Sequence, residues 1–258
     1  SLISIGPLRV QYYAITWLAS AIFIYMFLKT NKIIIELGLD KEKVNDMVFL
    51  YGLFFGAICG GRIGYMFFYG SSQLIENPLS LFYVWQGGLS FHGGLAGVVA
   101  SLFIFSRKNS IEFLRLMDAV ALSMPIGLGL VRIGNFFNSE IVGVLTNSDY
   151  GVVFLNRGEV LPRHPAQLYE AFGYIILFAV LMVIYNKTKL KDKKGFIFGF
   201  FLMFLFVVRF IVEYVKESQG GLEEQFGILS TGQWLSIPFI LFGIGLMVKS
   251  LLFLNEKK

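Results

Sequence analysis

Long apolar segments recur along the chain, and short polar stretches separate them. Each segment is continuously apolar rather than alternating, which is typical of membrane-spanning helices and not of the strands of a membrane β-barrel. About 20 apolar residues in a helix cross the hydrocarbon core of a bilayer. The pattern predicts seven such helices, over residues 13–28, 47–69, 91–105, 116–136, 166–185, 196–214 and 234–253.

The polar stretches alternate in their content of Lys and Arg. Most basic residues fall after the first, third and fifth segments and at the C-terminal end, and few fall in the other stretches. Basic loops stay in the cytoplasm, so the pattern predicts an outer N-terminus and a cytoplasmic C-terminus, which requires an odd number of spans. The alternative, a signal peptide at residues 13–28, is disfavoured because its flanking charges run in the reverse order.

Composition supports the same class of protein. Hydrophobic residues make up 56% of the 258 residues, charged residues 15%, and the mean hydropathy is +0.69. These values exclude a disordered chain, a coiled coil and an ordinary soluble enzyme. The sequence therefore predicts an all-α polytopic membrane protein with residues 1–258 as a single integral membrane domain, and no nucleic-acid partner. Cys59 is the one cysteine, so neither an intrachain disulfide nor a cysteine-based metal site is expected.

Two external stretches are longer than ordinary turns. Residues 137–164 are predicted to form a small external cap, with a possible short strand at 150–155. Residues 70–90 carry Phe82, Tyr83 and Trp85, aromatic residues that favour the headgroup layer of a membrane. We therefore expect this second stretch to be an external interfacial segment.

Three arginines, Arg62, Arg132 and Arg209, fall inside predicted helices. An arginine near the bilayer centre costs at least about 2.5 kcal/mol, so it usually has a partner or a function. Each of the three lies on a segment that runs outward, so all are expected at the depth of the outer leaflet. Other polar residues are expected at the same depth: His92, Glu140, His164, Gln167, Tyr169, Glu170 and Glu213.

Two interpretations of these arginines remain open at this point. In the structural one, Arg209 pairs with Glu213 four residues on, and Arg62 extends to the outer headgroups. In the functional one, the guanidinium groups bind the phosphate of an anionic lipid, whose geometry they match. Pro125 and the glycines before Arg132 favour the second, because irregular helix at membrane depth is tolerated around a cavity or inside the protein.

Several stretches together resemble the bacterial prolipoprotein diacylglyceryl transferases. The resemblance extends from residue 6 to about residue 238, in the order of the family. The matching stretches are 6–7 (GP) with 12–13 (YY), 60–65 (GGRIGY), 87–97 (GGLSFHGGLAG), 132–143 (RIGNFFNSEIVG), 163–170 (RHPAQLYE) and 209–213 (RFIVE).

The resemblance implies a reaction and its substrates. The family transfers the diacylglyceryl group of phosphatidylglycerol to the lipobox cysteine of a prolipoprotein signal peptide, without a cofactor or a metal. A location in the bacterial cytoplasmic (inner) membrane, with an active site toward the outer leaflet, follows from it. A tyrosine found in some members is Leu205 here, so no hydroxyl acts at that position.

The resemblance also implies which residues act. We expect His92, Arg132 and Arg209 to be catalytic. The residues expected to bind substrate are Tyr13, Arg62, Asn135, Glu140, Gly143, His164 and Glu213. Two alternatives remain from the sequence, an anionic-lipid or anion transporter (flippase) and an inactive lipid-binding relative.

Overall fold

The structure is a computed structural model that describes residues 3–5, 8–10, 12–68, 70–217 and 229–252. Gly6 and Pro7, which belong to the first matching stretch, lie outside the described residues. The chain divides into two compact units, residues 1–27 with 117–258, and residues 28–116. We describe each unit by itself, and the predicted single-domain organisation stays a prediction.

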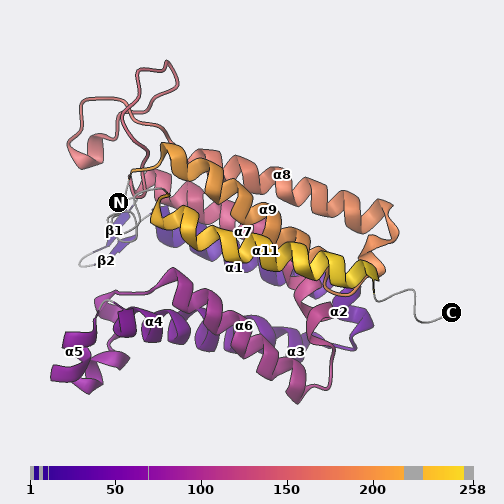
Figure 1. Ribbon diagram of the computed structural model, residues 1–258. Helices are drawn as coiled ribbons and strands as arrows, with labels where there is room; N and C mark the ends of the chain where they lie inside the picture. Colours follow the sequence, from indigo (N-terminus) through magenta and orange to yellow (C-terminus); the bar gives the residue numbers. More distant parts are fainter. Residues whose placement is uncertain (1–2, 6–7, 11, 69, 218–228, 253–258) are drawn as a thin grey trace. The chain divides into compact units, whose positions relative to one another are not determined.

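Helices dominate the described residues (Figure 1). Elements labelled η are 3₁₀-helices, except η1, which is a π-helix. The elements are β1 (Ile3–Ile5), β2 (Leu8–Val10), α1 (Tyr12–Thr30), α2 (Lys32–Glu36), α3 (Lys41–Asn45), η1 (Asp46–Gly60), α4 (Gly61–Phe68), α5 (Ser71–Glu76), η2 (Pro78–Phe82), η3 (Val84–Gln86), α6 (Phe91–Lys108), α7 (Phe113–Phe137), η4 (Leu155–Arg157), α8 (Ala166–Lys187), η5 (Lys189–Asp192), α9 (Phe196–Val212), η6 (Glu213–Val215) and α11 (Thr231–Leu252).

A helix lies at each of the seven predicted segments, with ends that differ by a few residues. Within the described residues, six helices are long and apolar enough to cross a bilayer: Tyr12–Thr30, Lys41–Phe67, Phe113–Phe137, Ala166–Lys187, Phe196–Val215 and Thr231–Leu252. The protein is therefore a multi-pass helical membrane protein. Helix α6 is outside this set because its 18 residues include Arg107 and Lys108 in the last turn, which with His92 lower its mean hydropathy. The seven-span count and the direction of the termini stay predictions.

Two local features differ from the sequence prediction. β1 and β2 form a short antiparallel hairpin, with Ile3 paired to Val10 and Ile5 to Leu8, which the hydropathy pattern did not reveal. The possible strand at residues 150–155 is absent. There Val152 alone forms a bridge, to Arg163, and the chain turns into η4 at Leu155.

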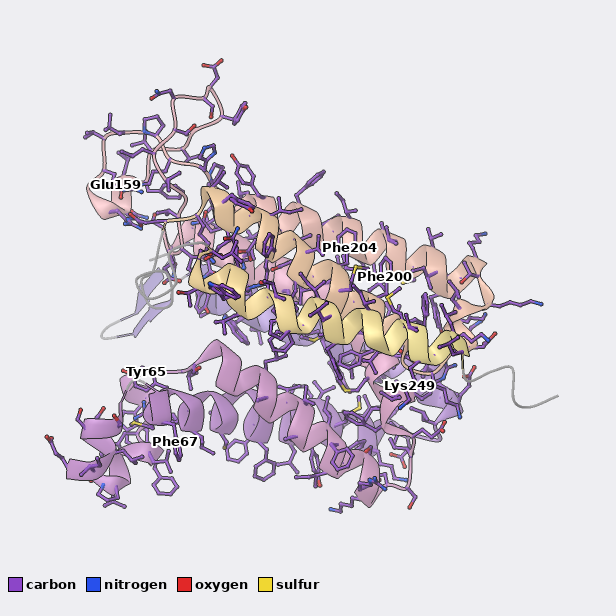
Figure 2. All side chains as sticks on the ribbon, viewed as in Figure 1. Tyr65, Phe67, Glu159, Phe200, Phe204 and Lys249 are labelled. Carbon is purple, nitrogen blue, oxygen red and sulfur yellow. The ribbon has the colours of Figure 1, made fainter. Side chains whose placement is uncertain are left out.

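Unit 1 is a bundle in which α9 packs against both α8 and α11 (Figure 1). Large apolar side chains face outward along it, including Leu18, Phe172 and Leu241, which are each more than 60% exposed. Such outward apolar faces are expected of helices surrounded by lipid. On α9, Phe200 and Phe204 stack at 6.0 Å between ring centroids, and both are labelled in Figure 2.

A buried carboxylate joins α7 to the start of α9. Gly195, with φ of 82°, is the N-cap residue of α9 and has no side chain to accept a hydrogen bond from the first N–H groups of the helix. Asp118 of α7 is fully buried and supplies the missing acceptor, because its oxygens accept from the backbone N–H of Gly195 at 2.8 Å and of Phe198 at 2.9 Å. A negative charge at a helix N-terminus is favourable. This contact fixes the position of α9 along α7.

Unit 2 is built around close packing of α6 on η1 and α4. A Cβ atom on Gly60 would lie 2.7 Å from both the carbonyl oxygen of Gly93 and the Cα of Gly97. One on Gly93 would lie 2.6 Å from the carbonyl oxygen of Gly60. These glycines therefore let two backbones approach, as small residues do in membrane helix pairs. Gly93 is part of this contact, so its missing side chain has a packing role.

We predict that Gly60→Ala destabilises the protein. The added methyl group would overlap backbone atoms of α6, which cannot move as a side chain can, and overpacking of this kind costs about 1–3 kcal/mol. Gly61→Ala is the matched control, because its Cβ would meet Leu89 at an ordinary 3.5 Å. Thermal unfolding in detergent measures both variants. Equal unfolding temperatures for the two would contradict the packing account.

Candidate functional site

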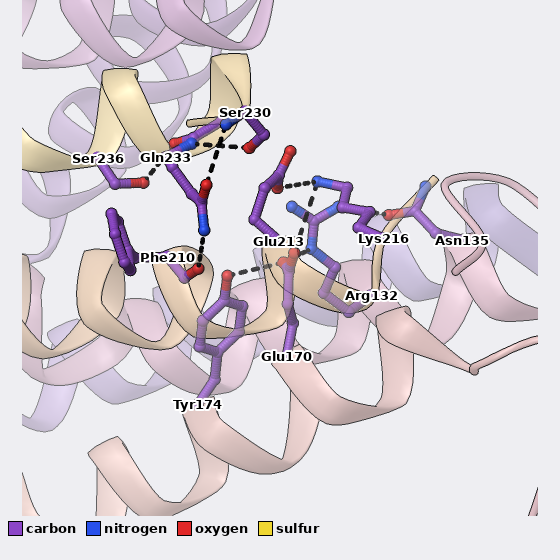
Figure 3. A network of polar contacts seen from close by, with 11 residues as sticks. Arg132, Asn135, Glu170, Tyr174, Phe210, Glu213, Lys216, Ser230, Gln233 and Ser236 are labelled. Atoms are coloured by element: carbon purple, nitrogen blue, oxygen red, sulfur yellow. Dashed lines mark hydrogen bonds and ion pairs between the residues drawn. The ribbon is translucent and has the colours of Figure 1, made fainter. Parts of the chain in front are cut away.

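The carboxylate of Glu170 is the centre of a buried polar cluster in unit 1 (Figure 3). Glu170 is in the second turn of α8, and its side chain is 2% exposed. Its Oε2 lies 2.5 Å from the Nε of Arg132 on α7, and Tyr174 donates its hydroxyl to the same oxygen at 2.9 Å. Its Oε1 lies 3.8 Å from the Nζ of Lys216. A carboxylate buried to this degree requires opposite charges and hydrogen bonds.

Arg132 is held on two sides. Besides the ion pair to Glu170, its Nη1 donates to the Oδ1 of Asn135 at 3.2 Å. The amide of Asn135 in turn donates to the Oε2 of Glu140 at 2.9 Å. Arg132 and Asn135 are one helical turn apart on α7, so they lie on the same face of the helix. The guanidinium plane of Arg132 is therefore fixed before any ligand binds.

The end of α9 adds further charges to this cluster. Glu213 begins η6, directly after α9, and its Oε2 lies 3.1 Å from the Nζ of Lys216. Arg209, one turn earlier, acts electrostatically on Glu170. Arg132, Arg209 and Lys216 with Glu170 and Glu213 thus make a group of three cations and two carboxylates. Two of these cations are guanidinium groups, whose geometry matches that of a phosphate.

Gly143 lies where the cap crosses the segment after α9. Its N–H donates to the carbonyl of His164 at 2.9 Å, and it pairs in an antiparallel bridge with Lys216. A Cβ atom here would lie 2.5 Å from the carbonyl oxygens of His164 and Val215, so only glycine fits. The position of Lys216 therefore depends on this backbone crossing, and Gly143 acts on the site through it.

Four charged side chains of alternating sign reinforce the same crossing, and Glu159 among them is labelled in Figure 2. Arg163 lies 2.5 Å from Glu159 and 3.1 Å from Glu217, and Arg157 lies 3.0 Å from each of these carboxylates. The pairs are partly exposed, so each contributes little alone. As a network they connect the cap to the segment that carries Lys216.

The backbone around Glu140 adopts a rare conformation. Ser139 and Ile141, on either side, have φ values of 58° and 55°. A β-branched residue in this left-handed region is strained by roughly 1–3 kcal/mol, and such strain occurs at functional sites. The turn is held by the N–H of Glu140, which donates to the carbonyl of Asn135 at 2.9 Å, and by the Nε2 of Gln167, which donates to the carbonyl of Glu140 at 2.5 Å.

Arg62 has a different environment, within unit 2. It is 3% exposed, and its guanidinium donates to four backbone carbonyls, those of Ser80, Leu81, Gly87 and Gly88. Extension to the outer headgroups, one of the two interpretations above, is therefore not what Arg62 does. Its hydrogen bonds hold residues 78–88, the segment that leads to α6, against α4. A role for Arg62 in substrate binding stays a prediction.

Tyr13, His164 and His92 complete the expected set. A Cβ on Gly134 would lie 3.2 Å from the ring of Tyr13, so this tyrosine lies beside the turn of α7 that carries Arg132 and Asn135. The Nδ1 of His164 lies 3.2 Å from the hydroxyl of Tyr169. His92 is in the first turn of α6, and its side chain lies outside the described part of the structure.

The cluster includes residues that were not among the predicted site residues. From the sequence, Glu170 and Gln167 were expected only as polar residues at the depth of the arginines. Lys216 is one of the few basic residues in the external stretches, and Tyr174 was not singled out. Their spacing held a signal, because Gln167, Glu170 and Tyr174 lie three and four residues apart and so share one face of α8. Among the described residues, no group of His, Cys, Asp and Glu is arranged to hold a metal ion.

Comparisons with known proteins agree with the resemblance. A model of the prolipoprotein diacylglyceryl transferase family matches residues 1–249. A Vibrio cholerae protein named phosphatidylglycerol–prolipoprotein diacylglyceryl transferase is 42% identical over 250 residues, which cover 96% of this chain and 90% of that protein. Proteins with the same name from Vibrio atlanticus and Tolumonas auensis are 40% and 38% identical, over 96% of this chain and 89% and 94% of theirs. This chain therefore belongs to the prolipoprotein diacylglyceryl transferase family.

Proposed function

We propose that this chain transfers the diacylglyceryl group of phosphatidylglycerol to the lipobox cysteine of prolipoproteins, the first step of lipoprotein maturation. The relatives named above carry both substrates in their name. The observation that carries the proposal here is the fixed guanidinium of Arg132 within a buried cluster that contains further cations. The site of transfer is the outer leaflet of the bacterial cytoplasmic membrane.

The transfer is a displacement at carbon. The cysteine sulfur attacks the glyceryl carbon that carries the phosphate ester, a carbon–sulfur bond forms, and the carbon–oxygen bond to phosphate breaks. Glycerol phosphate leaves with the bonding electron pair, and the thiol gives up its proton to a base. The reaction thus balances without a cofactor. An ordinary cysteine thiol has a pKa near 8.5 and reacts as thiolate, so a base accelerates it.

The described contacts support particular roles. Arg132 and Arg209 hold the phosphate and stabilise the negative charge that grows on the leaving oxygen. Asn135 and Tyr13 orient the headgroup, and Glu140 and Glu213 fix the cations or bind headgroup hydroxyl groups. Gly143 and His164 shape the backbone crossing beside Lys216. His92 is our candidate for the base.

The topology that suits this reaction has seven spans, with α6 as the third, the N-terminus outside and the C-terminus cytoplasmic. Residues 137–164 then form an external cap, and residues 70–90 lie in the outer headgroup layer. Exposed Phe82 and Trp85, at 66% and 74%, support that placement. The three basic loops are then cytoplasmic and the cap is outside.

We predict that the cap and the basic loop after α8 are labelled from opposite sides. Asn156→Cys in η4 and Asp192→Cys in η5 both place a thiol at an exposed position, in a Cys59→Ser background. In intact spheroplasts, a membrane-impermeant maleimide should label the cap variant alone. Permeabilised cells are the control, in which both should react. Labelling of the Asp192 variant in intact spheroplasts would reverse the orientation.

We predict that Arg132→Lys lowers the rate of transfer by about 10²- to 10³-fold. Lysine keeps the charge but loses the planar fork that contacts Glu170 and Asn135, and loss of one such donor has this effect in other enzymes. Purified protein, a lipobox peptide and phosphatidylglycerol in micelles would be followed by mass spectrometry of the diacylglyceryl adduct. Arg157→Lys in the cap is the matched control and should stay within a few-fold of wild type.

The outcomes of that assay separate the candidate functions. Wild-type adduct that is lost with Arg132→Lys supports the proposal. Adduct formed equally well by wild type and by Arg132→Lys would remove Arg132 from the mechanism. A folded wild-type protein that binds both substrates and makes no adduct would be an inactive relative. Movement of labelled phosphatidylglycerol across vesicle membranes without adduct would indicate a flippase.

We predict that His92→Gln lowers transfer by about 10²- to 10⁴-fold near neutral pH, the usual contribution of a general base. A higher assay pH should restore part of the rate, because the peptide thiol then ionises without help. Wild type and His164→Gln are assayed under the same conditions for comparison. Near-normal turnover by His92→Gln would exclude it as the base and leave the family assignment intact.

A further inference from the structure

The side-chain oxygen of Gln167 is a buried acceptor beside the turn of Glu140. Gln167 is in the first turn of α8, one turn before Glu170, and is 1% exposed. Among the described residues, its Oε1 has no hydrogen-bond partner. A buried polar atom without a partner has lost its hydrogen bonds to water and gained none, so folded proteins seldom retain one without a reason.

The orientation of this amide is fixed by its other contact. The Nε2 of Gln167 lies 2.5 Å from the backbone carbonyl of Glu140. A carbonyl can only accept, so the nitrogen must face it, and rotation of the amide by half a turn would oppose two oxygens. The unpartnered atom is therefore an acceptor, and the group that completes it must be a hydrogen-bond donor.

The surroundings indicate the kind of donor. The amide faces the strained turn of Glu140, whose carboxylate accepts from Asn135 beside Arg132, and Gln167 precedes Glu170 by one turn on α8. A phosphate held by Arg132 carries its glycerol headgroup a few bonds away, and the two free hydroxyl groups of that glycerol are donors. Among the described residues no side chain of the cluster, Arg132 and Lys216 included, donates to this oxygen.

We propose that the Oε1 of Gln167 accepts a hydrogen bond from a hydroxyl group of the phosphatidylglycerol headgroup. Gln167 is then a residue that determines lipid specificity, in addition to supporting the Glu140 turn. The inference rests on the proposed function, because it takes phosphatidylglycerol as the lipid. A site with a buried acceptor rejects a ligand that lacks the matching hydroxyl, since the acceptor then stays unpaired.

The test compares phosphatidylglycerol with analogues whose headgroup lacks one or both hydroxyl groups, phosphatidyl-1,3-propanediol, phosphatidyl-1,2-propanediol and phosphatidylpropanol. The quantity measured is the ratio of kcat/KM for phosphatidylglycerol to that for each analogue. In wild type we expect a ratio of about ten or more for at least one analogue that lacks a single hydroxyl. Gln167→Met, which has similar length and no acceptor, should bring that ratio close to one.

Two further variants separate recognition from support of the fold. Gln167→Glu keeps an acceptor and loses the donor to Glu140, so it should be less stable and yet keep the discrimination. Gln233→Met is the matched control, a buried glutamine of the same unit whose Oε1 already accepts from the N–H of Ser230 at 2.9 Å. It should lower kcat/KM for all lipids alike. Thermal unfolding of each variant records its stability.

Each outcome bears on one claim. No adduct from wild type with any lipid would overturn the proposed function itself. Adduct formation with equal kcat/KM for all four lipids would overturn the role of Gln167 and leave the proposed function standing. So would a Gln167→Met variant that loses activity equally with every lipid, because that is the result of a purely structural role or of a donor on the peptide.

Discussion

The ion pair between Glu170 and Arg132 is the interaction on which the rest of the site depends. Both side chains are almost fully inside the protein, and at 2.5 Å each neutralises a charge that the interior would otherwise exclude. Tyr174 and Lys216 complete the coordination of the carboxylate, and Asn135 that of the guanidinium. Because every member has a partner, the arginine is oriented before the lipid arrives. A catalytic donor that needs no reorganisation stabilises a transition state most effectively.

The surrounding fold brings these groups together from distant parts of the chain. Glu170 comes from α8, Arg132 from α7, and Lys216 from the segment after α9. Asp118 fixes the start of α9 against α7 from the other end of the bundle, and Gly143 fixes the segment after α9 against the cap. The positions of the three charges therefore depend on two backbone contacts that carry no catalytic group.

Hydropathy alone predicted where the helices lie, because a bilayer allows few alternatives to a continuous apolar helix. The sequence also singled out Arg132 and Arg209 as charged residues inside apolar segments, and their depth in the membrane stays a prediction. The sequence did not reveal which residues these charged side chains contact. One interpretation paired Glu213 with Arg209, four residues before it, and the sequence did not indicate Lys216, whose Nζ lies 3.1 Å from Glu213 in the structure. Arg62, like Arg132, is an arginine inside an apolar segment. Its partners are backbone carbonyls, which no residue type in the sequence could indicate.

The coupling between Glu170 and Arg132 is the most direct test of this picture. The free energy of unfolding in detergent would be measured for Glu170→Gln, Arg132→Gln and the double variant. Each single change leaves a buried charge without its partner and should cost about 3–5 kcal/mol, and the double variant should cost clearly less than the sum. Strictly additive costs, or single variants as stable as wild type, would contradict the central role of the pair.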